Sequence, residues 1–243
     1  MPQTEFRKTS AHILRRALPC FLVYLLVILM TPTVWGGDKE KDEETLKNAA
    51  DVLQEMVNSR DIPTGLLANA QCVMVLPNVK KFGVGIGGSG GRGPMSCRAG
   101  KDFDGPWSAP AMYSIGGASV GLQLGGTSTD FVLLVMGNKG VEAILQDKTK
   151  LGTDATAAAG PGATAASTTV GGADVLTYAR SKGLFAGVSL DGATLHQDRD
   201  ANTRLYGKAI TARDIVSGSE VKPPAGGDAL VSLLNSKAGK RGN

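Results

Sequence analysis

The sequence predicts an α+β domain. We expect a Gly-rich, mainly antiparallel or barrel-like sheet, with an amphipathic helix before it and several short helices around it. Glycine makes up 33 of the 243 residues, about twice its usual share of ~7%. Apolar residues come in short runs that are typical of strands. A clear helical period near the N-terminus is confined to residues 45–58, where the apolar positions fall on one face.

The start of the chain has the pattern of a secretory signal peptide. A basic segment ends at Arg16, Ala17–Met30 is a continuous apolar run, and small residues precede a cleavage point after Gly36 or Gly37. The alternative is an uncleaved membrane anchor, which usually needs about 20 apolar residues. We therefore expect residues 1–37 to be a signal peptide and the protein to be exported, periplasmic or extracellular, and peripheral at a membrane.

Most of the net charge of +4 belongs to this leader. Residues 1–36 hold four basic side chains and one acidic side chain, so the rest of the chain carries 22 basic and 21 acidic residues. The basic composition therefore does not indicate nucleic acid binding.

Two cysteines, Cys72 and Cys97, follow the leader. Their spacing is compatible with a disulfide in an oxidising compartment and equally with two buried thiols. No group of His or Cys has the spacing of a zinc site, so we expect no metal.

The elements and boundaries follow from periodicity and from Gly, Pro and Asp turns. We expect a charged spacer over 38–44, a main domain over 45–218, a linker over 219–227, and a C-terminal helix and tail over 228–243. Within the domain we expect helices at 45–58, 63–69, 139–145, 198–206 and 212–217, with short strands between 72 and 192, including a buried strand at 131–136.

The stretch KKFGVGIGGSGGRG contains the pattern G-x-G-x-x-G twice. A dinucleotide site needs a helix directly after these glycines, because the helix N-terminus holds the pyrophosphate. Residues 89–110 contain three prolines and five glycines and cannot form that helix. We therefore exclude a dinucleotide, expect no cofactor, and interpret the glycines as a strand and turn that need bare backbone.

Several segments resemble the SYLF domain family, from about Thr45 to Gly218. The similarity is carried by IPTGLLANAQCVMVLPNVKKFGVGIGGSGGRG, WSAPAMYSIGGASVGLQLG, YARSKGLFAGVSLDGA and NTRLYG, in that order. Yeast and animal relatives are known as phosphoinositide-binding and actin-associated proteins, and bacterial relatives as exported proteins of poorly defined role. The resemblance implies binding to lipid at a membrane surface and no established catalytic site. Actin binding is not expected of an exported chain.

A phosphate-bearing headgroup would need clustered cations and turn amides. The alternative is that the available cations are solvated rim charges. The candidates lie around the glycine stretch and in the second half of the domain: Lys80, Lys81, Arg92, Arg98, Lys101, Arg180 and Lys182.

The sequence does not indicate an enzyme. No G-x-S-x-G motif occurs, and His196 has no partners at the spacing of a triad or a metal site. We therefore predict a non-enzymatic domain that binds anionic or phosphate-bearing lipid headgroups. The alternative is a structural or protein-interaction module of the cell envelope with an envelope protein as its partner.

Overall fold

The computed structural model describes residues 36–121, 127–161, 172–181, 184–187, 190–218 and 221–239. Most of the predicted signal peptide lies outside these residues, and so does Lys182. From Asp38 onward the chain forms one compact unit. The helices are α2 (Gly36–Asn58), α3 (Thr64–Asn69), α4 (Asn138–Ile144), α5 (Arg199–Tyr206), α6 (Ala212–Ser217) and α7 (Asp228–Lys237).

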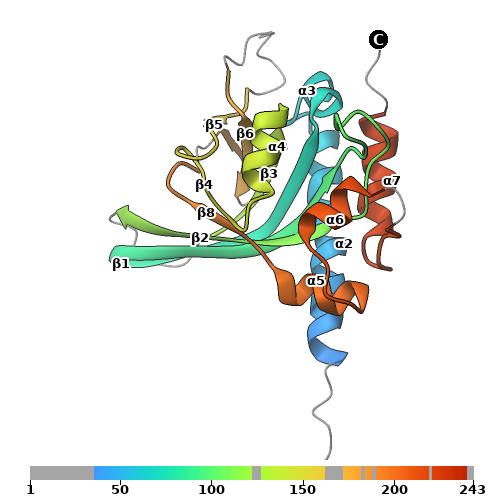
Figure 1. Cartoon of the computed structure of the whole chain (residues 1–243). Coiled ribbons are helices and arrows are strands. Elements are labelled where there is room, and N and C mark those ends of the chain that lie inside the picture. The colour runs from blue at the N-terminus through green and yellow to red at the C-terminus, as the bar shows by residue number, and fades with distance from the viewer. Residues whose placement is uncertain are drawn as a thin grey trace, which may run out of the picture. The chain divides into compact units, whose positions relative to one another are not determined.

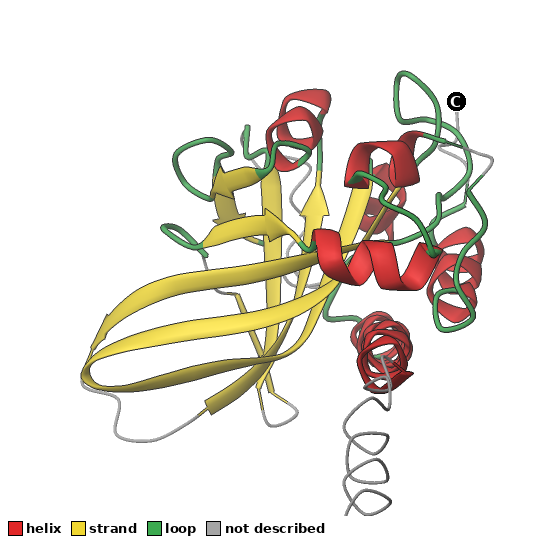
Figure 2. Cartoon of the chain, turned by 60° about the horizontal axis from the view of Figure 1, so that its bottom comes forward, coloured by secondary structure: helices red, strands yellow, loops and turns green. Residues whose placement is uncertain are grey.

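One curled, half-barrel sheet of eight strands forms the centre of the domain (Figures 1 and 2). Its order is β4-β8-β2-β1-β3-β6-β5, with β7 also paired to β6. Neighbours are antiparallel except β5 and β6, so the predicted α+β class with a mainly antiparallel sheet is confirmed. The strands are β1 (Cys72–Cys97), β2 (Ala111–Gly121), β3 (Thr127–Val135), β4 (Lys148–Lys150), β5 (Ala157–Ala159), β6 (Val175–Ser181), β7 (Leu184–Gly187) and β8 (Thr194–Gln197).

The longest strand, β1, folds back on itself. A straight strand of its 26 residues would extend over about 85 Å, yet the Cα atoms of Cys72 and Cys97 lie 3.9 Å apart. The Arg98 N–H also donates to the Gln71 carbonyl at 2.8 Å. The first arm pairs with β3 and the second arm with β2. β1 is therefore a long hairpin whose two ends meet beside a disulfide.

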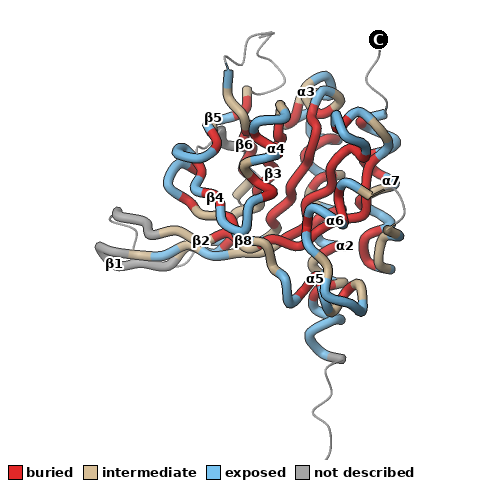
Figure 3. Tube along the Cα trace, viewed as in Figure 1, coloured by how far each residue is buried: buried red, intermediate tan, exposed pale blue. Residues whose placement is uncertain are grey.

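Both faces of the sheet are covered, by different helices. Alternation along β1 sends Met74 to a core that α4 and α6 complete, and sends Val73 and Val75 to a second core under α2 and α7. Figure 1 shows α4 and α6 in front of the sheet and α2 behind it. The far ends of β1 and β2 reach beyond the helices (Figure 1). Figure 3 shows buried residues where the helices cover the sheet.

The N-terminal helix is longer than the sequence predicted. The segment DKEKDEE, expected to be a charged spacer, forms the first turns of α2, which begins at Gly36. The predicted apolar face is correct: Leu46, Leu53 and Met56 are fully buried. Membrane insertion of this face would therefore require α2 to leave the core.

The segment expected to be a linker is packed against the domain. A Cβ at Gly226 would lie 2.5 Å from the Glu43 carbonyl oxygen, and one at Gly227 would lie 2.8 Å from Pro110. These close approaches place α7 firmly on the second core, where Leu230 and Leu234 are buried. No helix in the described part of the chain is long and apolar enough to cross a membrane.

Candidate functional site

A hollow of about 260 Å³ lies between α2 and the two arms of β1. It contains two of the predicted cations, Lys80 and Arg92, and no carboxylate lines it. Lys80 comes from the first arm of β1 and Arg92 from the second. The remaining lining residues are small or uncharged: Thr45, Asn48, Pro77, Asn78, Gly90 and Gly91.

A β-bulge in the first arm of β1 directs Lys80 outward. The pairing with β3 shifts register between Leu76 and Val79, and Asn78 adopts the left-handed conformation with φ of 56°. The Asn78 N–H donates to the Asp130 carboxylate at 2.7 Å, which holds the bulge. Val79 is then buried in the core, so the next side chain, Lys80, points to the other face.

Two glycines of the stretch KKFGVGIGGSGGRG, both outside its G-x-G-x-x-G pattern, are required by this bulge. A Cβ at Gly91 would lie 2.7 Å from Val79 Cγ2, and one at Gly93 would lie 2.0 Å from the Val75 carbonyl oxygen. Both distances are too short for any side chain, so the second arm can approach the bulge only at glycine. These two glycines of the stretch therefore allow close packing of the two arms, whereas a Cβ at Gly88 or Gly90 of the G-x-G-x-x-G pattern would meet no atom closer than 3.8 Å.

Arg92 is held at the edge of the hollow by two carboxylates. Its guanidinium lies 2.6 Å from Asp42 of α2 and 2.9 Å from Asp198, the N-cap of α5. Within the described residues, Nε of Arg92 has no hydrogen-bond partner. That nitrogen is buried, so Arg92 has a fixed position and a ligand would meet only the exposed part of its side chain, which is 37% exposed.

Asp42 is the residue of this site that the sequence did not reveal. Its side chain is fully buried and also accepts a hydrogen bond from Arg204 Nε at 2.7 Å. That hydrogen bond raises the pKa of Arg204, although burial acts against it. The sequence did contain a pattern that could have identified Asp42. This residue lies four residues before Leu46, on the same face of the helix as the buried apolar residues. A carboxylate on that face needs a cationic or hydrogen-bonding partner.

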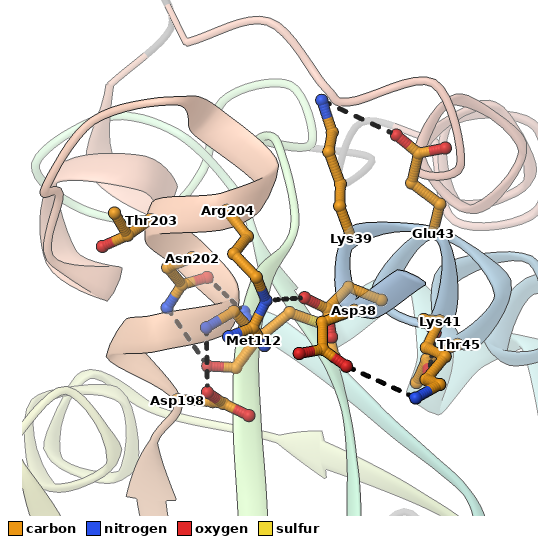
Figure 4. Close-up of polar contacts among 12 residues, drawn as sticks. Asp38, Lys39, Lys41, Glu43, Thr45, Met112, Asp198, Asn202, Thr203 and Arg204 are labelled. Carbon is orange, nitrogen blue, oxygen red and sulfur yellow. Dashed lines mark hydrogen bonds and ion pairs between the residues drawn. The ribbon is translucent and has the colours of Figure 1, made fainter. Parts of the chain in front are cut away.

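α5 is fixed to the sheet beside this ion-pair group. Asn202 is buried; its side-chain oxygen accepts from the Met112 N–H at 2.7 Å, and its Nδ2 donates to the Met112 carbonyl at 3.2 Å. Figure 4 shows Asn202 and Arg204 reaching from α5 toward β2 and α2, with Asp198 beside them. The rigid contact between α5 and β2 therefore keeps Arg204 and Asp198 in place around Asp42.

Among the described residues, the other predicted cations lie outside the lining of the hollow. Lys81 lies on the opposite side of the strand, with Nζ 6.0 Å from the centre of the Phe131 ring. Arg180 is only 15% exposed and pairs with Glu55 at 3.1 Å and Asp61 at 3.6 Å, at the C-terminal end of α2. Lys101 is exposed, on the loop that follows the disulfide end of β1.

Arg98 is a structural residue, which contradicts its place among the headgroup candidates. The residue is 1% exposed, and its guanidinium stacks 4.7 Å from the Trp107 ring. It donates to the carbonyls of Ala70 at 3.2 Å, Ala68 at 3.0 Å, and Ala238 and Gly239 at 2.8 Å each. Trp107 Nε1 also donates to the Ala238 carbonyl. Arg98 therefore fixes the end of α7 and has no surface for a ligand.

Cys72 and Cys97 form a disulfide in the structure. Both residues are fully buried and lie at the two ends of the β1 hairpin. The bond joins the arms at the end nearest α3 and the Arg98 cluster, and the hollow lies farther along the same hairpin.

The described residues hold no group of three or more His, Cys, Asp or Glu side chains that could bind a metal. His196 is exposed on β8, paired with Lys148 on one side and Ser114 on the other. The described part of the chain also exposes one large hydrophobic side chain broadly, Leu184 at 75%. The described surface is therefore suited to polar or ionic contacts.

The sequence is similar to a known family and to several known proteins. A family model described as "Ysc84: Las17-binding protein actin regulator" matches residues 116–237, about half of the chain. The chain belongs to this family, the Ysc84 or SYLF family, as its motifs predicted.

Relatives in fungi and mammals match most of the chain. It is 37% identical over 212 residues to the SH3 domain-containing protein PJ696.02 of Schizosaccharomyces pombe, covering 85% of this chain and 48% of the relative. It is 35% identical over 205 residues to protein YSC84 of Saccharomyces cerevisiae, covering 79% and 43%. For SH3 domain-containing YSC84-like protein 1 of Mus musculus the identity is 35% over 201 residues, covering 78% and 58%. The chain thus spans about half the length of these relatives.

Proposed function

We propose that this chain is a non-enzymatic domain that binds phosphate-bearing lipid headgroups at a membrane surface through the hollow beside Lys80 and Arg92. One observation carries the proposal: Lys80 and Arg92 line this hollow, and Lys80 has no ion-pair partner among the described residues, although the chain after its leader has nearly balanced charge. A volume of about 260 Å³ is below the usual range for drug-sized ligands, roughly 300–1,000 Å³. It is better suited to a headgroup than to a whole lipid.

The physical basis is electrostatic. Lys80 offers an exposed ammonium with no ion-pair partner among the described residues, and Arg92 offers a guanidinium that Asp42 and Asp198 hold in place. Hydrogen bonds between such groups and phosphate are stronger than neutral ones. Each basic residue near an anionic membrane contributes about 1 kcal/mol, so binding should weaken steeply as salt rises.

Vesicle co-sedimentation tests the proposal with the full chain and its Lys80→Glu variant. On vesicles of phosphatidylcholine with phosphatidylserine or phosphatidylinositol phosphate, we expect Lys80→Glu to weaken binding about 30-fold, because the reversal changes the charge by two. Lys101→Glu, an equal charge reversal on an exposed lysine outside the hollow, should bind like the parent. Both variants should keep the parent unfolding temperature. Equal binding by the parent and Lys80→Glu would reject the hollow.

A second candidate function is actin regulation, which the description of the matching family model names. Co-sedimentation of the full chain with actin filaments, without lipid, distinguishes the two. Saturable binding to filaments, unchanged in Lys80→Glu, would favour the second candidate over the first.

We also propose that the chain is exported. The basic and apolar pattern of its leader supports this, and so does the disulfide between Cys72 and Cys97, because such bonds persist mainly in oxidising compartments. Intact-mass measurement on the exported chain tests it: we expect a new N-terminus near Gly37 or Asp38. Recovery of an unprocessed chain in the cytoplasm would contradict export.

A further inference from the structure

The sheet carries an open basic surface next to the hollow. Strand register aligns Lys148 of β4, His196 of β8, Ser114 of β2 and Arg92 of β1 in one cross-strand row. The next row on the same face holds Lys150, Thr194, Gly116 and Gly90. Neither row contains a carboxylate. Since neighbouring strands lie about 4.8 Å apart, each row extends over about 14 Å.

These rows point away from the core. Thr149, between the two lysines, is buried, and so are Leu195 and Ile115 on the neighbouring strands. Because successive strand residues alternate between faces, Lys148, Lys150 and His196 lie on the opposite side, where all three are exposed. We call this side of β4, β8, β2 and β1 the outer face.

The middle of the outer face carries two glycines and is therefore poor in side chains. A Cβ at Gly116 or Gly90 would meet nothing closer than a backbone carbonyl oxygen at 3.9 Å. Packing within the chain therefore does not require glycine at either position, unlike Gly91 and Gly93 in the bulge. Glycine inside a strand often marks a place where a ligand or another surface approaches the backbone closely.

The lysines at the two margins of this face are available. Lys148 and Lys150 on one margin and Lys80 on the other form no ion pair within the described residues. Of the nearby carboxylates, Asp198 pairs with Arg92, and Asp154 accepts from the Lys150 backbone N–H at 2.6 Å, which leaves its charge in place. The two rows themselves hold cations and no carboxylate, so they are positively charged.

We propose that the outer face lies flat on an anionic bilayer, with Lys148 and Lys150 forming a second contact beside the hollow. This proposal rests on the proposed function and assigns the orientation of the domain on the membrane. A planar array of anionic headgroups matches a side-chain-poor sheet that has lysines at both margins. A peptide or a single soluble anion would use a groove or a point contact, and would not need the distance between Lys80 and the β4 lysines.

The test compares the double variant Lys148→Gln/Lys150→Gln with the parent on vesicles of phosphatidylcholine with and without phosphatidylserine. Loss of two membrane-facing charges should weaken binding to the anionic vesicles about 30-fold, at about 1 kcal/mol per charge. A control double variant, Lys101→Gln/Lys208→Gln, removes two exposed lysines outside the outer face and should bind like the parent. Thermal unfolding of all three chains confirms that they are folded.

The outcomes separate this proposal from the proposed function. If Lys80→Glu weakens binding and Lys148→Gln/Lys150→Gln does not, the hollow stands and the flat orientation is overturned. If neither variant weakens binding, both proposals are overturned. If the parent binds soluble dextran sulfate as tightly as anionic vesicles, with the same loss in the double variant, the partner is a polyanion and the bilayer proposal is overturned.

Discussion

Arg98 shows how much one buried side chain can organise in this fold. Its guanidinium donates to carbonyls before β1, within the loop after β1, and at the end of α7. Breaking a buried charged network usually costs about 3–5 kcal/mol. A lysine at this position keeps the charge but has a single ammonium, which cannot reach carbonyls in several directions.

We therefore predict that Arg98→Lys lowers the free energy of unfolding by about 3 kcal/mol, measured by urea denaturation. Lys101→Met, a change at an exposed neighbour, should stay within about 0.5 kcal/mol of the parent. A loss below about 1 kcal/mol in Arg98→Lys would show that the carbonyl contacts contribute little to stability.

At this scale the sequence predicted residue types better than residue roles. It placed Lys80 and Arg92 around a glycine strand, and the structure brings both to one hollow. It also grouped Arg98 with them, because a cation near a turn looks the same whether it is exposed or buried. The buried Arg98 differs from an exposed cation because it donates to the Ala238 carbonyl. That contact joins residues far apart in the sequence, so it cannot be predicted from local pattern.

Among the elements, α2 makes a connection that periodicity alone does not reveal. Its apolar stripe holds it on the sheet, and Asp42 adds ion pairs to Arg92 of β1 and Arg204 of α5. The helix thus positions one cation of the hollow as well as covering the core.

Removing this carboxylate should loosen the site. We predict that Asp42→Ala lowers the free energy of unfolding by about 2 kcal/mol, because two partly buried guanidinium groups lose a shared partner. Glu44→Ala, on an exposed position of the same helix, should have almost no effect. Urea denaturation measures both. Equal stability of the two variants would mean that solvent replaces Asp42 without cost.

Helices with a capping signal or regular apolar spacing were predictable, and the shortest strands were not. The boundaries of α6 and α7 match those expected, because Thr211 forms a capping box and the apolar spacing in α7 is regular. β4 and β8 have three and four residues, too few for a periodic signal. Their pairing depends on partners far away in the sequence, so the outer face could not be predicted from it.

On the scale of the whole molecule, the disulfide closes the hairpin around which the sheet is built. β1 pairs with β2 on one side and β3 on the other, so its two arms occupy the centre of the sheet. The sequence left a disulfide and free thiols as equal alternatives, because cysteine spacing does not show that β1 folds back. Once it does, Cys72 and Cys97 are neighbours on adjacent arms.

We predict that Cys72→Ala/Cys97→Ala lowers the free energy of unfolding by about 3 kcal/mol, the loop-closure value for a bond across 25 residues. Reductant should then destabilise the parent and leave the double variant unchanged, as followed by urea denaturation with and without reductant. Because the hollow lies farther along the hairpin, the folded double variant should still bind anionic vesicles. Alkylation of Cys72 or Cys97 in the native parent under non-reducing conditions would contradict the bond; alkylation of Cys20 would not. Lost vesicle binding in a variant that remains folded would show that the hollow depends on the disulfide at the other end of the hairpin.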